Sequence, residues 1–271
     1  MRFIPAIAAL VLTALPAVAE VSQAKLQAFV EVTGYNVIID SLQQGAMAGP
    51  GMTGNAAADF GKQYTALAEE VFDPKAMNQR ALEMLGVALT DDLVNYGAAF
   101  YASDLGQRLV AVENESHMAD DQERMAEGGR LVDEMSNTDM KRLQLMQDLA
   151  TAVGSTDVSI RALVEMQVRF TMAAAAAGSL ALGMSEDELR ARSTDAMDGL
   201  RDQIATMGVI GNAYTYRALS NEDVAEYVRE LKTPEMQQIY DVLNAVQYEI
   251  MIEKYEELGS RMGELKPETD L

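Results

Sequence analysis

The chain has 271 residues, of which 49% are hydrophobic and 23% charged, with 42 acidic residues against 21 basic ones. The formal charge of −21 disfavours binding to nucleic acid or to anionic membrane surfaces, because Lys and Arg provide most of the affinity for both. The sequence contains no cysteine, which excludes disulfides and cysteine-based catalysis.

Residues 1–19 have the pattern of a secretory signal peptide. Met1 and Arg2 give a positive start, an apolar run covers 3–15, and an Ala-x-Ala sequence ends at Ala19. A transmembrane anchor is disfavoured, because the run is shorter than the roughly 20 residues that cross a bilayer. We therefore expect a periplasmic protein cleaved after Ala19. Its mature chain would carry 20 basic and 42 acidic residues, a charge of −22. Solubility in a salty habitat is the simplest explanation of that charge.

Helical spacing of apolar residues dominates the first part of the mature chain. It predicts one long helix over 22–47, which the Gly- and Pro-rich run 45–54 would end. A phosphate-binding loop is disfavoured there, because no Gly-Lys-Ser/Thr follows. Two further helices are expected over 56–72 and 73–85, and the second begins with an Asp-Pro start signal.

The stretch 89–110 predicts a helical hairpin, and a degenerate copy of it returns at 219–240. In each copy a hydroxyl residue opens one helix and a second hydroxyl residue, thirteen positions later, opens the next. Ser and Thr favour these points, because their side-chain oxygen accepts a hydrogen bond from a free backbone N–H of the first turn. In the second copy, the second hydroxyl residue is followed by a proline, which suits the first turn of a helix. These residues are Thr90, Ser103, Ser220, Thr233 and Pro234.

Between the hairpins, the polar run 113–129 ends in two glycines and is read as a solvated helix extension or as the seam between two halves. A helix starting at Ser136 and ending near 153 is expected next. The helix after it, starting near Ser155, includes the uncharged run 170–184. A membrane span is disfavoured because this run is too short, so we expect a buried central helix.

In the C-terminal part, Ser185 and Glu188 form a capping-box pattern for a helix to about Met207, which the glycines of 208–212 are expected to end. The tail 259–271 is expected to fray. The last helix carries an apolar seam with alternating spacings of three and four, made of Met236, Ile239, Leu243, Val246 and Ile250. Beside the seam lies a stripe of Tyr240, Tyr248 and Tyr255.

Similarity is not limited to the hairpins, since the segment from Leu26 resembles the segment from Ile160 at an offset of 134, against 130 for the hairpins. A period of this length indicates a duplicated domain instead of a solenoid. Chance similarity between amphipathic helices is the alternative. We predict an all-α helical bundle built from two duplicated halves, over 20–130 and 131–271.

The first hairpin resembles the motif of the domain of unknown function 2059 family, whose members are exported all-helical bacterial proteins. That motif runs roughly Leu-Ser/Thr, then Glu-Leu, then Phe-Tyr-x-Ser-Pro-x-Gly. The first copy keeps Leu89, Thr90, Val94, Phe100, Tyr101, Ser103 and Gly106, with Leu93 for the acid and Asp104 for the proline. The second keeps Leu219, Ser220, Asp223, Val224, Thr233 and Pro234, with Glu230 and Leu231 for the aromatic pair. The resemblance implies the helical fold and export, and it implies no activity.

Few residues offer catalytic chemistry. His117 is the only histidine, and helical spacing puts it on one face with Glu113, Asp120 and Asp121. This group could chelate a divalent cation, although a solvated charged face is the favoured interpretation. The 18 methionines are interpreted as core residues. We assign no catalytic, cofactor-binding or metal site.

Three functions fit these observations. The leading hypothesis is a non-enzymatic envelope interaction or scaffold protein, in which the hairpins serve packing and an unknown protein is the partner. The second is a periplasmic carrier of an apolar small molecule or lipid, held in a cavity lined by Met172, Ala176, Tyr240 and Tyr248. A metal-dependent hydrolase is third. No nucleic-acid partner and no membrane span after signal removal are expected.

Overall fold

The computed structural model describes residues 21–47, 56–154 and 156–265, and its regular elements in these ranges are all helical, which confirms the predicted all-α bundle. The predicted signal peptide, the end of the Gly-rich run, Ser155 and the last residues of the tail lie outside the described residues. The elements are α1 (Gln23–Val32), α2 (Tyr35–Met47), α3 (Ala56–Val71), α4 (Pro74–Ala88), α5 (Asp91–Tyr101), α6 (Asp104–His117), α7 (Asp121–Thr138), α8 (Met140–Ala152), α9 (Thr156–Ala176), α10 (Glu186–Gly199), α11 (Arg201–Thr215), α12 (Asn221–Leu231), α13 (Pro234–Arg261) and the 3-10 turn η1 (Met262–Glu264).

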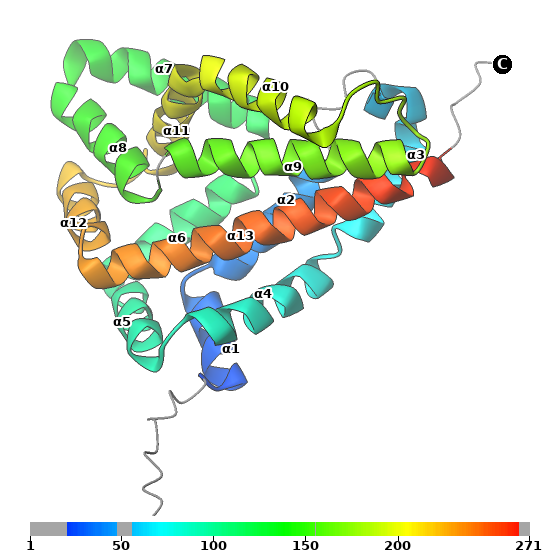
Figure 1. Cartoon of the computed structure of the whole chain (residues 1–271). Coiled ribbons are helices and arrows are strands. Elements are labelled where there is room, and N and C mark those ends of the chain that lie inside the picture. The colour runs from blue at the N-terminus through cyan, green and yellow to red at the C-terminus, as the bar shows by residue number, and fades with distance from the viewer. Residues whose placement is uncertain (1–20, 48–55, 155, 266–271) are drawn as a thin grey trace, which may run out of the picture.

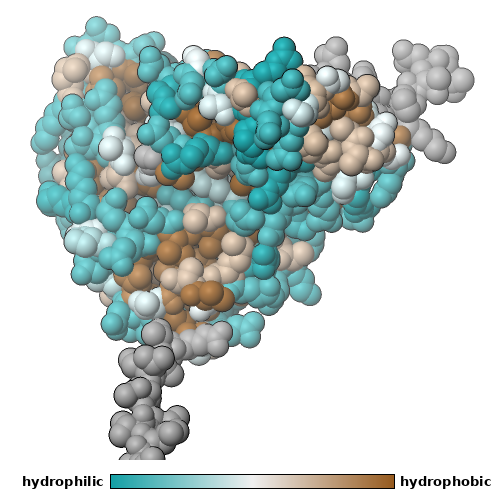
Figure 2. Space-filling model, in the orientation of Figure 1, coloured by the Kyte–Doolittle hydropathy of each residue, from teal (hydrophilic) through white to brown (hydrophobic). Residues whose placement is uncertain are grey.

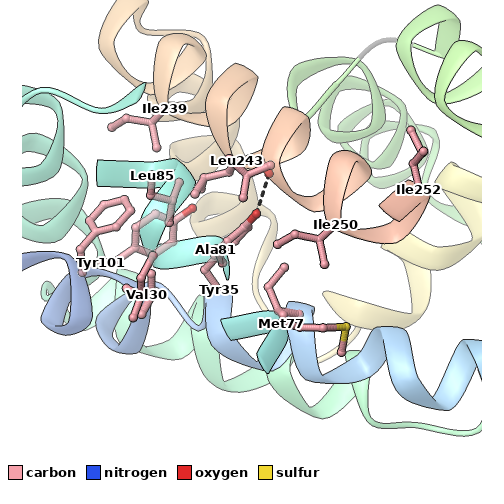
Figure 3. Packing of buried hydrophobic residues seen from close by; sticks show 14 of the residues in the cluster. Val30, Tyr35, Met77, Ala81, Leu85, Tyr101, Ile239, Leu243, Ile250 and Ile252 are labelled. Atoms are coloured by element: carbon pink, nitrogen blue, oxygen red, sulfur yellow. Dashed lines mark hydrogen bonds between the residues drawn. The ribbon is translucent and has the colours of Figure 1, made fainter. Parts of the chain in front are cut away.

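The longest helix, α13, runs through the molecule and packs along α9 (Figure 1). It also contacts α3, α4 and α5, so residues far apart in the sequence share one core. The predicted seam of α13 is buried throughout. Figure 3 shows Leu243 and Ile250 of this seam beside Ala81 and Met77 of α4. Tyr35 of α2 donates a hydrogen bond of 2.7 Å to the Leu243 carbonyl, which satisfies its buried hydroxyl.

Small residues set the distance between α9 and α13. A Cβ on Gly259 would lie 2.5 Å from the Phe170 carbonyl oxygen, and a Cβ on Gly263 would lie 2.6 Å from the Ala177 carbonyl oxygen. The predicted fraying from residue 259 is therefore wrong for 259–265, since Gly259 is buried against α9 and α13 continues to Arg261.

The predicted single helix over 22–47 is wrong, because α1 and α2 are separated at Thr33 and Gly34. Gly34 has a φ of 71°, a left-handed conformation that L side chains rarely adopt. The Thr33 hydroxyl donates to the Phe29 carbonyl at 2.8 Å and helps to end α1. The chain thus turns where only apolar periodicity was visible in the sequence.

The predicted helix start at Ser136 is also wrong. α7 continues through Ser136 to Thr138, and Asp139 is the N-cap of α8, with its carboxylate accepting from the Arg142 backbone N–H at 2.9 Å. The expected boundary between halves, at 130/131, falls inside α7. The polar run 113–129 is accordingly divided between the end of α6 and the first turns of α7.

The glycines of 208–212 lie inside a helix instead of ending one. α11 runs through Gly208 and Gly211, which contradicts the predicted break at 208–212, and α10 ends earlier, at Gly199. Gly128 of α7 explains the close approach of α7 to α11, because a Cβ there would lie 2.3 Å from the Ile210 carbonyl oxygen. The capping box of Ser185 with Glu188 at the start of α10 is confirmed.

The uncharged run 170–184 is helical only as far as Ala176. Gly178, with a φ of 78°, and a hydrogen bond of 3.0 Å from the Ser179 N–H to the Ala174 carbonyl end α9 there. The prediction of a buried helix over the whole run is therefore wrong, and Ala176 is exposed. Within the described residues, no helix has the length and apolar character needed to cross a bilayer.

Each hydroxyl residue of the two hairpins is an N-cap. The side-chain oxygens of Thr90, Ser103, Ser220 and Thr233 accept from the backbone N–H three residues later. The helices α5 and α12 have equal length and bounds offset by 130 residues, as are the starts of α6 and α13. The duplication of the two halves stays a prediction. It requires equivalent helices at a constant offset, and these two pairs of helices have one.

Candidate functional site

The two hairpins, far apart in the sequence, pack against each other. Both terminal nitrogens of Arg108 on α6 donate to the Asp223 carboxylate on α12 at 2.8 Å. The Tyr96 hydroxyl of α5 donates to the Thr233 hydroxyl at 3.2 Å, which links the first hairpin to the N-cap of α13. Phe100 stacks on Tyr227, with ring centroids 6.0 Å apart. The paired motifs therefore build one interface.

Gly106 makes the tight turn of the first hairpin possible. A Cβ at this position would lie 2.3 Å from the Phe100 carbonyl oxygen and 2.5 Å from the Tyr101 Cα, distances that no real side chain tolerates. The spacing from the Phe-Tyr pair through Ser103 to Gly106 thus has a steric cause. Because Gly106 has no side chain, the first turn of α6 packs directly on the last turn of α5. The Tyr101 side chain is buried.

Tyrosine hydroxyls gather where the hairpins meet. Tyr101 of α5, Tyr227 of α12 and Tyr240 of α13 form a triangle in which each hydroxyl hydrogen-bonds to the other two, at 3.1 Å for Tyr101–Tyr227 and 2.6 Å for the other pairs. Tyr216, the C-cap of α11, donates to Oε1 of Glu113 on α6 at 2.7 Å. We call these five residues the tyrosine–glutamate cluster.

The cluster is held from outside by α8. Arg142 donates from Nη2 to the Tyr216 carbonyl at 2.5 Å and from Nη1 to Asn221 Oδ1 at 3.0 Å, while the Asn221 side chain donates to Asp139 at 3.2 Å. These bonds fix the short connection from α11 to α12, which carries Tyr216. The start of α8 therefore positions a residue of the cluster.

Burial controls ionisation in the cluster. It raises the pKa of Glu113 above its ordinary value, and the hydroxyls of Tyr216 and Tyr227 oppose this shift. Burial also raises the pKa values of Tyr101, Tyr216 and Tyr227 well above the ordinary value, so these hydroxyls keep their protons at neutral pH. In the described part of the chain, no Lys or Arg forms an ion pair with Glu113.

A cleft of about 700 Å³ opens beside the cluster, between α6, α8, α11 and α13. This volume lies in the range of small-molecule sites, roughly 300–1,000 Å³. Three cluster tyrosines and Glu113 form part of its wall. The remaining wall combines apolar side chains with amides and hydroxyls, among them Ile204, Met207, Val209, Asn244, Gln247 and Tyr248. The cleft therefore joins the polar groups of the cluster to a wall of mixed apolar and polar side chains.

The segment that carries the first hairpin matches a known family. Residues 75–134 match the bacterial family described as "Uncharacterized protein conserved in bacteria (DUF2059)", which confirms the resemblance. The matched segment covers 60 of the 271 residues. It runs from α4 into α7 and contributes Tyr101 and Glu113 to the cluster. Comparisons with curated proteins and with solved structures gave no match.

The cation chelate considered within the DUF2059 segment is not assembled. Glu113 accepts from Tyr216, Asp120 caps α7, and Asp121 pairs with Arg124 at 2.7 Å. The described residues contain no group of three His, Asp or Glu side chains that could hold a metal ion. His117 borders the cleft, and although its ring keeps solvent access, its packing and the charge of Arg124 lower its pKa.

The cavity that the carrier hypothesis predicted is only partly in the right place. Tyr240 and Tyr248 line the cleft, but Met172 packs in a separate cluster around Ile160, and Ala176 is exposed near the end of α9. Met172 and Ala176 lie too far along α9 to reach the cleft wall, to which that helix contributes Thr156 and Ser159. The cleft lies instead beside the C-terminal part of α6, within the segment that matches the family model.

Two cluster residues, Tyr216 and Tyr227, were missed by sequence reasoning. They lie in the second half, outside the DUF2059 segment, and no local pattern relates them to Glu113, about a hundred residues earlier. The only indication in the sequence was their position. Tyr227 lies within the second hairpin and Tyr216 just before it, and the first hairpin carries the aromatic pair Phe100 and Tyr101.

Proposed function

We propose that this protein binds a small amphipathic molecule in the cleft and acts as a non-enzymatic carrier. The observation that supports the proposal is the cleft of about 700 Å³, whose wall combines the polar groups of the cluster with apolar side chains such as Ile204, Met207 and Val209. The periplasmic location we propose rests on the signal-peptide pattern of residues 1–19. The carrier hypothesis thus replaces the scaffold hypothesis as the better supported one.

A binding role is favoured over hydrolysis by the arrangement of the cleft wall. In the described residues, the His117 ring has no hydrogen bond to a hydroxyl or a carboxylate, so it lacks the partner that activates a nucleophile. The hydroxyls of Ser116 and Thr215 bond to each other at 2.7 Å, and Thr215 donates to the Gly211 carbonyl. These groups support the wall and are not aimed at a substrate.

An interaction role is the second candidate, and one surface supports it. The face drawn in Figure 2 is mostly hydrophilic, with an apolar area over α4 below α13. In α4, Val87 is 87% exposed, which is unusual for an apolar side chain of a helix. An apolar area of this kind is typical of a protein contact.

Native mass spectrometry of the protein isolated from its own cells tests the carrier proposal. We expect a discrete added mass on the wild type. Gly208→Phe should abolish it, because Gly208 lines the cleft and its Cβ would make an ordinary 3.7 Å contact with Ala150, leaving the ring to fill the space. Gly129→Phe is the matched control, since a Cβ there meets nothing within 4 Å and the residue does not line the cleft. A wild type without added mass, or equal added mass on both variants, would refute the proposal.

A further inference from the structure

We propose that the ligand of the cleft carries a primary ammonium group, which pairs with the Glu113 carboxylate and donates hydrogen bonds to the tyrosine hydroxyls beside it. This inference rests on the proposed binding function of the cleft and adds the chemical class of the ligand. Three observations support it. The hydroxyl protons of the cluster are already engaged in hydrogen bonds within the protein, Glu113 has no basic partner among the described residues, and the protein is strongly acidic.

The cluster has used all of its own hydrogen-bond donors. Each tyrosine hydroxyl has one proton to donate and two lone pairs that accept. The triangle of Tyr101, Tyr227 and Tyr240 contains three hydrogen bonds and uses three protons, and Tyr216 gives the fourth proton to Glu113. What remains at the cluster is acceptor capacity, namely hydroxyl lone pairs and the free lone pairs of the carboxylate. A ligand group that meets the cluster must therefore donate.

Several amides and hydroxyls near the cluster also donate hydrogen bonds within the protein. Asn212 donates to the Met146 carbonyl at 3.0 Å, Asn244 donates to the Val153 carbonyl at 2.6 Å, and Thr215 donates to the Gly211 carbonyl at 2.9 Å. Of the basic groups that line the cleft, Arg124 is paired with Asp121 at 2.7 Å. Arg124 and the side-chain amides of Gln147 and Gln247 keep other N–H donors on the wall, so only the part of the cleft formed by the cluster is poorly suited to a ligand carboxylate or phosphate.

Glu113 is a half-buried acid for which the described residues provide no basic partner. A carboxylate in such a place is costly unless it is protonated or paired with a cation. A metal ion would need several ligands, and the described residues offer no group of three. A primary ammonium has three N–H donors, which match one carboxylate and adjacent hydroxyl oxygens. The formal charge of −21 also raises the local concentration of cations.

Binding should strengthen as the pH rises toward neutral, because the proton and the ammonium compete for one carboxylate. Burial raises the pKa of Glu113, so acidification restores the neutral acid early and expels the cation. His117 acts in the same direction, since its protonation at low pH adds a positive charge to the cleft. The other titratable groups of the cluster are Tyr101 from α5, Tyr216 from the end of α11, Tyr227 from α12 and Tyr240 from α13. These tyrosines keep their protons between weakly acidic and neutral pH. Arg124 from α7 lines the same cleft and pairs with Asp121.

The test is an isothermal titration of the mature protein with n-hexylammonium chloride and, separately, with 1-hexanol as its neutral counterpart. Near neutral pH we expect the ammonium to bind at least about tenfold more tightly than the alcohol. E113Q should remove this preference, because glutamine keeps an acceptor for Tyr216 and loses the charge. E115Q is the matched control, since Glu115 is on the same helix, 62% exposed and paired with Arg217, and it should keep the preference.

Equal affinity of the wild type for both probes, or a preference that E113Q leaves unchanged, would overturn the ammonium inference. The carrier proposal would still stand if Gly208→Phe abolished binding of both probes. A wild type that binds neither probe would also overturn the inference, and the native mass measurement would then decide the carrier proposal by itself. If E113Q failed to fold, the wild-type titration from about pH 4, near the ordinary pKa of a glutamate, to about pH 8 would decide, because an affinity independent of pH over this range contradicts competition for Glu113.

Discussion

At the hairpin interface, the packing is so close that one added carbon atom would clash with the neighbouring backbone. Gly106 shows this most clearly, because the backbone of Phe100 and Tyr101 occupies the space that a Cβ would need. An interface of this kind places the Tyr101 hydroxyl within reach of Tyr227 and Tyr240. The glycine therefore acts on the cluster without touching the cleft.

Gly106→Ala should lower the free energy of unfolding by about 1–3 kcal/mol, the usual cost of overpacking, and the fixed backbone around it favours the upper end. Thermal or urea unfolding measures the loss. Gly129→Ala is the control, since open space around this mid-helix glycine should make alanine stabilising by about 0.5–1 kcal/mol. Equal effects of the two substitutions would mean that α6 does not press on α5 as described.

Among the elements, the hairpin caps, the capping box of α10 and the apolar seam were predictable because each is local, whereas the helix start predicted at Ser136 was wrong. An N-cap needs one side chain and the N–H three residues later, and a seam needs only the period of one helix. Helix ends at glycines were not predictable. Gly199 and Gly128 look alike in the sequence, but α10 ends at Gly199, whereas Gly128 lies inside α7 against Ile210 of α11, a contact that exists only in the fold.

The caps of the two hairpins should differ in strength. The Thr233 hydroxyl accepts from the Met236 N–H and from Tyr96, and it donates to the Glu230 carbonyl, whereas the exposed Thr90 hydroxyl accepts from the Leu93 N–H. We expect Thr233→Ala to cost about 1–2 kcal/mol and Thr90→Ala about 0.5–1 kcal/mol, measured by urea unfolding. Thr233→Ser keeps the hydroxyl and should restore most of the loss. A larger cost at Thr90 would contradict this account of the interface.

The whole molecule has one main core, to which residues of both predicted halves contribute, and the cleft lies where these halves meet. The all-α class could be predicted, because every long segment had a helical period. The site could not be predicted. Tyr101, Glu113, Tyr216, Tyr227 and Tyr240 come from five helices or their ends, and each looks like an ordinary hairpin, polar-face or stripe residue when only its neighbours in the sequence are known.

The central claim is that the cleft beside the cluster is a binding site for a small molecule. The most direct measurement is a crystal structure of the protein isolated, without unfolding, from the cells that produce it. We predict non-protein electron density in the cleft, in contact with Glu113 and with Met207. Side chains that close the cleft, or ordered water alone at full occupancy, would contradict the claim.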